Sequence, residues 1–325
     1  MDATALLTGD PVGMDALVED FGRAYRDVGF SYIVNHGIDA QLIDEVFEAS
    51  RQFHALGLDQ KMAIELNSDN RGFLPMDATM DINTKLAEVT KPNRSESFLM
   101  MCECAPDSPE VLAGDYLAGP NVWPDLAGFR ETVTAYHDAM CWLGRKMMGI
   151  AARAIGADPE VMVDHFASPV ASVRLLHYPP LPPGSPDDLY GSAPHCDFGC
   201  LTLLAQDDVG GLQVRPVGDG WIDVPNIPGS FVVNVGDMLR LWSNGQLLST
   251  PHRVTNSSRS SRFSIPFFFD PHVSTVIAPL RSCVTPERPV VADAVVWGDH
   301  LRSELEAGFE PHKMFTAEHP PESSI

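Results

Sequence analysis

Three side chains have the types and spacing of a metal site. His195 and Asp197 stand two positions apart, and in an extended backbone such residues point to the same face. His252 follows far enough along the chain for several strands to bring it back. Two neutral imidazoles and one carboxylate at three corners of an octahedron leave three positions open, which is the ligand pattern of non-haem Fe(II) centres.

An Arg-x-Ser segment strengthens this interpretation. Taken alone, His195 is better interpreted as a loop histidine bonded to its neighbour, and His252 is also compatible with a buried core histidine before a strand. Arg262 and Ser264, however, share one face of an apolar strand, where a guanidinium is costly to bury unless it meets an anion. The arginine fork suits a carboxylate, and the serine hydroxyl adds a further bond. The two groups together predict a site for an acid that also chelates the metal.

Seven further segments occur in a fixed order along the chain. They are VGFSYIVNHGI (28–38), NRGFLP (70–75), SESF (95–98), RLLHYPP (174–180), QDDVGGLQV (206–214), NVGD (234–237) and WSNG (242–245). With the triad and the Arg-x-Ser segment, this ordered set resembles the 2-oxoglutarate-dependent Fe(II) oxygenases, specifically their isopenicillin N synthase-like branch. Residues 206–212 and 245–252 also resemble bacterial ethylene-forming oxygenases, from which only fold and chemistry are carried over.

The resemblance implies a fold, a set of cofactors and a reaction. The fold would be α+β, with a double-stranded β-helix (jelly-roll) core and flanking helices mainly from the N-terminal half. Fe(II) would bind His195, Asp197 and His252, and 2-oxoglutarate would chelate it through its C1 carboxylate and C2 keto oxygen. The distal carboxylate of 2-oxoglutarate would meet Arg262, Ser264 and Tyr178. With O2 as the other reactant, a small molecule would be hydroxylated, desaturated or cyclised, with release of succinate and CO2.

The substrate side of the site is less defined. Its candidate wall residues, chosen from family-like motifs, are Arg94, Ser97, Phe98, Phe198 and Phe269, and each is equally compatible with a structural role. Arg94 stands where many relatives carry lysine, which is expected to alter the pocket. Residues 1–7 are a poor copy of the branch's usual opening strand, so that strand is expected to be shortened or absent.

Other functions use the same residues. An oxidase of the isopenicillin N synthase type would use Fe(II) and O2 without 2-oxoglutarate, and its Arg-x-Ser segment would hold a carboxylate of the substrate. A non-catalytic barrel that binds a small ligand would be expected to lack one triad residue, yet all three are present. A zinc hydrolase is disfavoured because nothing supplies the usual general base on a helix.

Composition narrows the possible partners. The net charge of −22 disfavours nucleic acid and anionic membrane surfaces. Six irregularly spaced cysteines without a zinc-knuckle pattern fit a reducing compartment. The first residues have no basic start and no long apolar run, so neither a secretory signal nor a membrane span is predicted. We therefore expect a cytoplasmic monomer that acts on a small molecule.

Hydrophobic periodicity divides the chain into three segments. Residues 1–168 read mainly as helices that pack on the core, with amphipathic stretches over 14–28, 42–54 and 126–155. Residues 169–280 contain about eight short strands separated by glycine turns, as in a jelly roll. These strands include 238–242 and 262–269. Residues 281–325 form a C-terminal helical segment and tail, and all three segments are expected to form one integrated domain.

Overall fold

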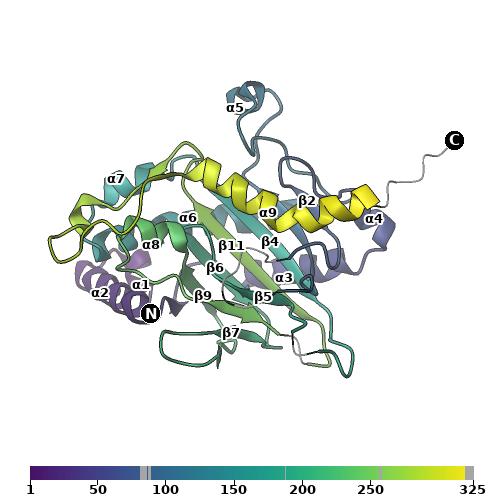
Figure 1. The fold of residues 1–325 in the computed structure, drawn as a ribbon, viewed down its shortest axis with the longest axis horizontal. Coiled ribbons are helices and arrows are strands. Elements are labelled where there is room, and N and C mark those ends of the chain that lie inside the picture. Colours follow the sequence, from purple (N-terminus) through teal and green to yellow (C-terminus); the bar gives the residue numbers. More distant parts are fainter. Residues whose placement is uncertain (81–85, 87–88, 187, 256–257, 319–325) are drawn as a thin grey trace.

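Two antiparallel sheets face each other in the computed structural model, which describes residues 1–80, 86, 89–186, 188–255 and 258–318 (Figure 1). The seven-stranded sheet has the order β1-β9-β6-β11-β4-β3-β2, with strands β1 (Phe30–Val34), β2 (Gly72–Leu74), β3 (Glu96–Met101), β4 (Val170–Tyr178), β6 (Leu201–Gln206), β9 (Ser230–Val235) and β11 (Arg262–Asp270). The smaller sheet has the order β5-β10-β7-β8, with β5 (Ser192–His195), β7 (Leu212–Val214), β8 (Ile222–Asp223) and β10 (His252–Val254). Apolar side chains of both sheets form one cluster between them. This is the jelly-roll core, and the fold is α+β.

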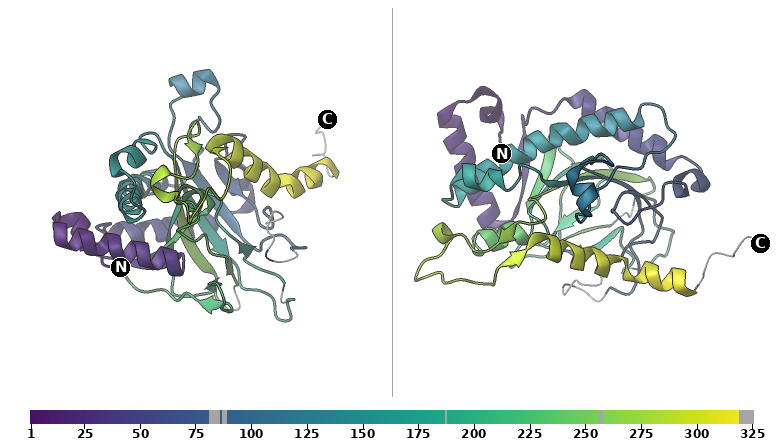
Figure 2. Two further views of the ribbon diagram at one scale, coloured as in Figure 1. Left: turned by 60° about the vertical axis from the view of Figure 1, so that its left-hand side comes forward. Right: turned by 90° about the horizontal axis from the view of Figure 1, so that it is seen from above.

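Helices cover the outer face of the larger sheet. Helices α3 (Ala40–His54) and α6 (Phe129–Ala154) pack against β4 and β11, and α6 runs across the sheet in Figure 2. The remaining helices are α1 (Thr4–Thr8), α2 (Pro11–Asp27), α4 (Leu58–Met62), α5 (Pro109–Ala113), α7 (Pro159–Asp164), α8 (Asp237–Trp242), the 3-10 turn η1 (Arg281–Cys283) and α9 (Trp297–Glu318). A short strand pair, β12 (Val276–Ile277) and β13 (Val295–Val296), precedes α9. The predicted tail beyond α9 lies outside the described residues.

Strand β11 contributes side chains to both the inner and the helix-covered outer face of the larger sheet, because successive side chains of a strand alternate between the faces. Arg262 and Ser264 point inward, toward the smaller sheet, and pair with Tyr178 and Leu176 of the inner apolar cluster. The phenylalanines at alternate positions point outward. Phe269, for example, stacks on Phe166, with ring centroids 5.0 Å apart. One nine-residue strand thus supplies polar groups to the site and rings to the helix interface.

Residues 238–242 form a helix rather than the predicted strand. In α8 the buried side chains are Met238, Leu239, Leu241 and Trp242, a spacing that gives one face of a helix. A short apolar run of this length does not by itself distinguish strand from helix. Gly236 and Asp237 begin the helix immediately after β9, so the chain turns out of the sheet at this point.

The N-terminal half contributes strands as well as helices. Strands β1, β2 and β3 all hydrogen-bond into the larger sheet, although the sequence predicted mainly helices for residues 1–168. The opening strand of the family is reduced to one parallel bridge between Asp2 and Val34. Within the described part of the chain, we find no helix with both the length and the apolar character needed to cross a bilayer.

Candidate metal and co-substrate site

The three predicted metal ligands meet at one point. Strands β5 and β10 are neighbours, and their register sets His195 opposite His252. Oδ1 of Asp197 lies 3.7 Å from Nε2 of each histidine, and one ligand atom from each residue lies within 4.8 Å of the other two. Among the described residues, no other group of three potential ligand side chains converges in this way.

Backbone carbonyls orient both imidazoles. Nδ1 of His195 donates to the carbonyl of Ala193 at 2.7 Å, and Nδ1 of His252 donates to that of Thr250 at 3.3 Å. A neutral ring that carries its proton on Nδ1 has its lone pair on Nε2. Both lone pairs therefore lie on the side of Asp197, as metal binding requires.

The carboxylate of Asp197 is held through its other oxygen. Oδ2 accepts hydrogen bonds from Oγ1 of Thr202 at 2.5 Å and from Nδ2 of Asn234 at 2.6 Å. Burial raises the pKa of Asp197, but the His252 and His195 rings and these two donors outweigh it, so the pKa lies below its usual value. The group is an anion with Oδ1 directed at the imidazoles.

The loop that carries Asp197 is tightly packed. The backbone N–H of Cys200 donates to Oδ1 of Asp270 at 2.5 Å, and a Cβ on Gly236 would lie 2.3 Å from the carbonyl oxygen of Gly199. Burial raises the pKa of Asp270 to about 7. These contacts join the loop to α8 and to the end of β11, so the ligand geometry is set by the whole fold.

Arg262 is a fully buried cation with neutral partners. Its side chain donates to Oγ of Ser264 at 3.0 Å and to Oε1 of Gln206 at 3.3 Å, and it lies over the Tyr178 ring at 4.9 Å. Its Nε has no hydrogen-bond partner within the described residues. The carboxylate of Asp207 interacts with the guanidinium electrostatically, but no carboxylate of the described residues forms an ion pair with it. A buried charge in this state is stabilised when an anion binds beside it.

The arginine and the metal ligands line the same interior. Phe30 packs edge-on against His252, with ring centroids 5.3 Å apart, and belongs to the inner apolar cluster that also contains Tyr178 and Val254. Val254 follows His252 by two residues on β10, whereas Tyr178 lies beneath the guanidinium of Arg262. The apolar cluster therefore lies between the metal ligands and Arg262 in the space between the two sheets.

The residues fit the two groups that the sequence implied. Two imidazole nitrogens and one carboxylate oxygen are a ligand set that would hold a ferrous ion. The orphaned Nε of Arg262 and the adjacent Ser264 hydroxyl suit a carboxylate in an apolar surrounding.

The predicted substrate-wall residues fall into two groups. Ser97 pairs with Leu176 and faces inward, where its hydroxyl accepts from Nε of Arg174 at 2.9 Å. Phe198 follows Asp197 and is half-buried, 6.3 Å from the Trp297 ring of α9. Arg94 forms an ion pair with Asp77 at 2.5 Å, with each side chain about one-third exposed.

Phe98 and Phe269 lie on the opposite face of the sheet. Phe98 contacts the rings of Phe53 and Phe129 from α3 and α6, and Phe269 lies against Gly144 of α6 and stacks on Phe166. Both rings are completely buried in the helix interface. This placement argues against substrate contact, so neither residue is carried into the proposed pocket.

Four supporting residues were not predicted. Thr202 and Asn234 hold Asp197, Gln206 bonds Arg262, and Arg174 reaches Ser97 on the inner face. Asn234, Gln206 and Arg174 lie in segments that already carried the family resemblance. Only the sheet register showed that these polar side chains point inward.

Comparisons with known proteins agree with this geometry. The family model of the 2OG-Fe(II) oxygenase superfamily matches residues 169–271, and that of the non-haem dioxygenase N-terminal region, named for morphine synthesis, matches residues 2–126. A 2-oxoglutarate-Fe(II) type oxidoreductase of Emericella nidulans is 35% identical, over 87% of this chain and 82% of that one. Homoarginine-6-hydroxylase of Arabidopsis thaliana is 33% identical, over 92% of each chain. The solved structure of a full-length Neurospora crassa protein in complex with α-ketoglutarate and thymine superposes with a TM-score of 0.81, at 27% identity, covering 94% of this chain and 96% of that one.

The chain belongs to the 2-oxoglutarate- and Fe(II)-dependent oxygenase superfamily. It is a non-haem dioxygenase that uses Fe(II), 2-oxoglutarate and O2 to oxidise a small molecule, with release of succinate and CO2. The alternatives of a 2-oxoglutarate-independent oxidase and a non-catalytic barrel are not favoured, because the relatives are 2-oxoglutarate enzymes and the metal triad is complete.

Proposed function

We propose that His195, Asp197 and His252 hold the iron, and that Arg262, Ser264 and Tyr178 anchor the distal carboxylate of 2-oxoglutarate. The observation that carries this assignment is the fully buried Arg262, which faces the same interior as the three converging ligands. An acid bound at both places would satisfy the charge of the guanidinium and the open positions of the metal together.

Each residue has a defined task in this proposal. Thr202 and Asn234 fix one oxygen of Asp197, so that its other oxygen stays directed at the metal position. The Arg262 fork sets the orientation of the co-substrate, and the apolar cluster around it excludes water. When bound, Fe(II) and 2-oxoglutarate activate O2 and supply the oxidising power.

An anaerobic titration tests the assignment without turnover. Fe(II) is added to the protein with and without 2-oxoglutarate, and the weak visible absorption of the chelate is followed. The band should appear only with both components. In the Arg262→Leu variant it should require a far higher 2-oxoglutarate concentration. An identical titration curve for the variant would contradict the anchoring role of Arg262.

We also propose that Ser97, Arg174, Phe198 and Arg94 form the substrate side of the pocket. Arg174 gives the inner wall a cation beside Ser97, which favours a substrate with a carboxylate or another anionic group. Homoarginine, the substrate named for the Arabidopsis relative, carries such a group. Succinate release measured over paired acids and their neutral amides should favour the acids, and Arg174→Leu should remove the preference. Equal rates for acids and amides would contradict this proposal.

We further infer that the protein is a cytoplasmic monomer of the isopenicillin N synthase-like branch, binding neither nucleic acid nor membranes. The net charge of −22 supports this inference, as do six cysteines that all lie in the described residues and are all free. We infer one integrated domain from segments 1–168, 169–280 and 281–325, because β1, β2 and β3 join the core sheet. Light scattering would measure the mass in solution, and a single unfolding transition is expected.

A further inference from the structure

A second reactive cluster lies outside the metal site, where the end of β3 meets α6. Sγ of Cys102 lies 3.7 Å from Nε2 of His137, and Sγ of Cys141 lies 3.7 Å from the same nitrogen. His137 and Cys141 are one helical turn apart on α6. Two sulfurs and one imidazole are thus gathered at one point.

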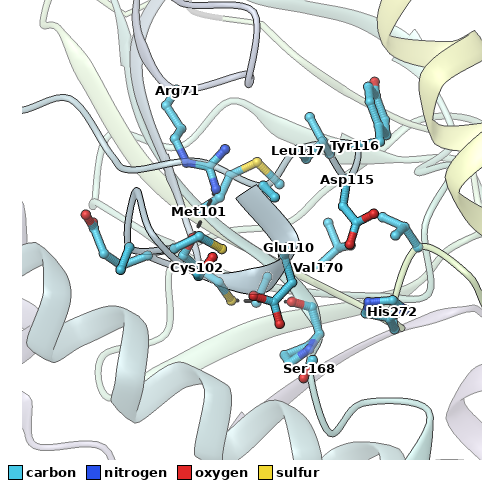
Figure 3. A pocket seen from close by; sticks show the side chains of 18 residues that line it. Arg71, Met101, Cys102, Glu110, Asp115, Tyr116, Leu117, Ser168, Val170 and His272 are labelled. Atoms are coloured by element: carbon cyan, nitrogen blue, oxygen red, sulfur yellow. Dashed lines mark hydrogen bonds between the residues drawn. The ribbon is translucent and has the colours of Figure 1, made fainter. Parts of the chain in front are cut away.

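Cys102 connects this cluster to a cavity. The cavity has a volume of about 350 Å³ and lies between the segment after β3 and the loops at residues 168–171 and 272–273 (Figure 3). Cys102 lines it and is half-buried, whereas Cys141 is buried behind it. The proposed metal and co-substrate residues are not among the side chains that line this cavity. Cys102 therefore borders a cavity separate from the proposed metal site.

The surroundings of His137 favour its cationic form. Nδ1 lies 3.3 Å from a carboxylate oxygen of Asp138, and Nε2 lies 3.4 Å from the carbonyl oxygen of Ala171. Only an imidazolium can donate to acceptors at both nitrogens. Burial lowers the pKa of His137, but Cys102 and Asp138 outweigh this effect and raise it overall.

Cationic groups approach Cys102 from two sides. The Arg71 guanidinium donates to the carbonyl of Cys102 at 3.0 Å and points toward it in Figure 3, while His137 contacts its sulfur. In its thiol form Cys102 also donates to the carbonyl oxygen of Pro169 at 3.4 Å. Interaction with Cys141 and with His137 lowers the pKa of Cys102, against the opposing effect of burial. The pKa of Cys141 is raised by the same Cys102 interaction and by burial. Titratable or charged groups that interact with these residues are Asp69, Glu103, Cys104, Asp138 and Arg145. The cavity is also lined by Glu110, Asp115, Tyr116 and His272.

We propose that Cys102 is a nucleophilic thiolate that reacts with hydroperoxides entering this cavity, and that Cys141 is the thiol that resolves the product into a disulfide. In the first step the Cys102 thiolate attacks the terminal oxygen of hydrogen peroxide, giving a sulfenic acid and hydroxide. In the second step the Cys141 sulfur attacks the sulfur of that sulfenic acid. The S–S bond forms and the S–O bond breaks. The Cys141 proton leaves with the hydroxyl group as water.

Position selects Cys141 over Cys104 as the resolving thiol. Sγ of Cys104 points at the backbone carbonyl of Cys102, 3.9 Å away, and not at its sulfur. Cys141 instead shares the His137 contact with Cys102. A disulfide between Cys102 and Cys141 would join β3 directly to α6.

Peroxide treatment of the full-length protein tests the proposal. Protein as purified and protein stripped of iron by a chelator are treated with stoichiometric hydrogen peroxide, and peptides are mapped by mass spectrometry. Both samples should lose two of the six thiols and yield one Cys102–Cys141 disulfide. A disulfide to Cys104, or oxidation that requires iron, would overturn the assignment.

Two variants and one rate measurement complete the test. Cys141→Ser should accumulate a Cys102 sulfenic acid that a 1,3-diketone reagent traps, whereas the control Cys283→Ser should form the same disulfide as the wild type. In the wild-type protein at about pH 6, iodoacetamide should alkylate Cys102 at least about tenfold faster than a free thiol of ordinary pKa in a model peptide. A rate no greater than that of the peptide would refute the thiolate, whether or not the variants fold.

Discussion

Arg262 and Lys61 are both buried cations, and they lie on opposite faces of the seven-stranded sheet. On the outer face, Nζ of Lys61 is 2.7 Å from a carboxylate oxygen of Glu96, whose other oxygen is 2.9 Å from Nδ1 of His177. On the inner face, the hydrogen-bond acceptors of Arg262 among the described residues are the neutral Ser264 and Gln206 side chains, and Asp207 interacts with it electrostatically without forming an ion pair. The outer charge is compensated within the chain, whereas we propose that a bound acid compensates the inner one.

This difference separates structural from functional polar groups in one sheet. A paired buried charge contributes to the fold, and removing one partner is costly because the other is left uncompensated. An unpaired buried charge destabilises the empty protein and strengthens ligand binding. Mutations on the inner face should therefore change ligand affinity, and mutations on the outer face should change stability.

The largest effect is expected from the Asp197→Ala substitution on the inner side. It removes a metal ligand, so Fe(II) affinity should fall by more than the roughly 10- to 100-fold typical of outer-sphere changes, and succinate release should cease. Isothermal titration under anaerobic conditions measures the first effect, and a succinate assay the second. Turnover at the wild-type rate would remove the metal assignment.

Exchanging the two cations for methionine tests the comparison directly. Arg262→Met should weaken 2-oxoglutarate binding by about 2–5 kcal/mol, with an unfolding free energy in the absence of ligand that is unchanged or higher. Lys61→Met should lower the unfolding free energy by about 3 kcal/mol, because the buried Glu96 loses its lysine partner, and should leave 2-oxoglutarate affinity unaltered. The two quantities come from anaerobic titration and urea unfolding. The same profile in both variants would break the comparison.

Asn234 extends the test to the support of the metal ligand. Asn234→Ala removes one donor to Asp197 and should lower Fe(II) affinity by roughly 10- to 100-fold. Asn244 is a matched control, since its buried amide donates hydrogen bonds to the backbone carbonyls of Cys283 and Pro289, which are not part of the metal site. Asn244→Ala should affect unfolding while leaving Fe(II) affinity intact. Equal Fe(II) affinities in the two variants would argue against the role of Asn234.

The loss of folding stability at low pH should arise in part from His54 on the outer face of the larger sheet. Burial is the main cause that lowers the pKa of His54 to about 3, while the unfolded chain binds this proton near pH 6.5. The contribution of the neutral His54 to folding stability is complete above its pKa in the unfolded chain. It is lost as the pH falls toward the pKa of His54 in the folded protein. Between about pH 7 and pH 5 the wild-type protein should lose about 2 kcal/mol through this group. His54→Gln should have a flatter profile in urea unfolding, and parallel profiles would exclude His54 as the cause.

The smallest effect is expected at Ser264. Ser264→Ala removes one neutral partner of Arg262, and a hydrogen bond to a charged group is worth about 1.5–3 kcal/mol. Because the guanidinium keeps Gln206 as a partner, the KM for 2-oxoglutarate should rise by only about tenfold, with kcat nearly unchanged. An increase as large as that of Arg262→Met would show that the hydroxyl, rather than the charge, dominates the anchor.

The sequence was sufficient to propose the metal triad and the acid anchor, because each contains a pair of residues set by local spacing. His195 with Asp197, and Arg262 with Ser264, are pairs at positions i and i+2, and a strand places such pairs on one face in any fold. The jelly-roll class followed from the short strands after Pro169 and the ordered motifs. These predictions did not depend on knowing which face of each strand is buried.

Only the tertiary structure decided which face each remaining side chain occupies. Strand β3 is buried on both faces, so alternation could not show that Ser97 points inward and Phe98 outward. The same holds for Phe269 on β11, and the short run in α8 was compatible with either period. The contacts of Cys102 with His137 and of Lys61 with Glu96 join segments far apart in the chain. These contacts arise from the packing of helices on a sheet. Burial on both sides of a strand removes the alternation of polar and apolar residues from which the direction of its side chains could be predicted.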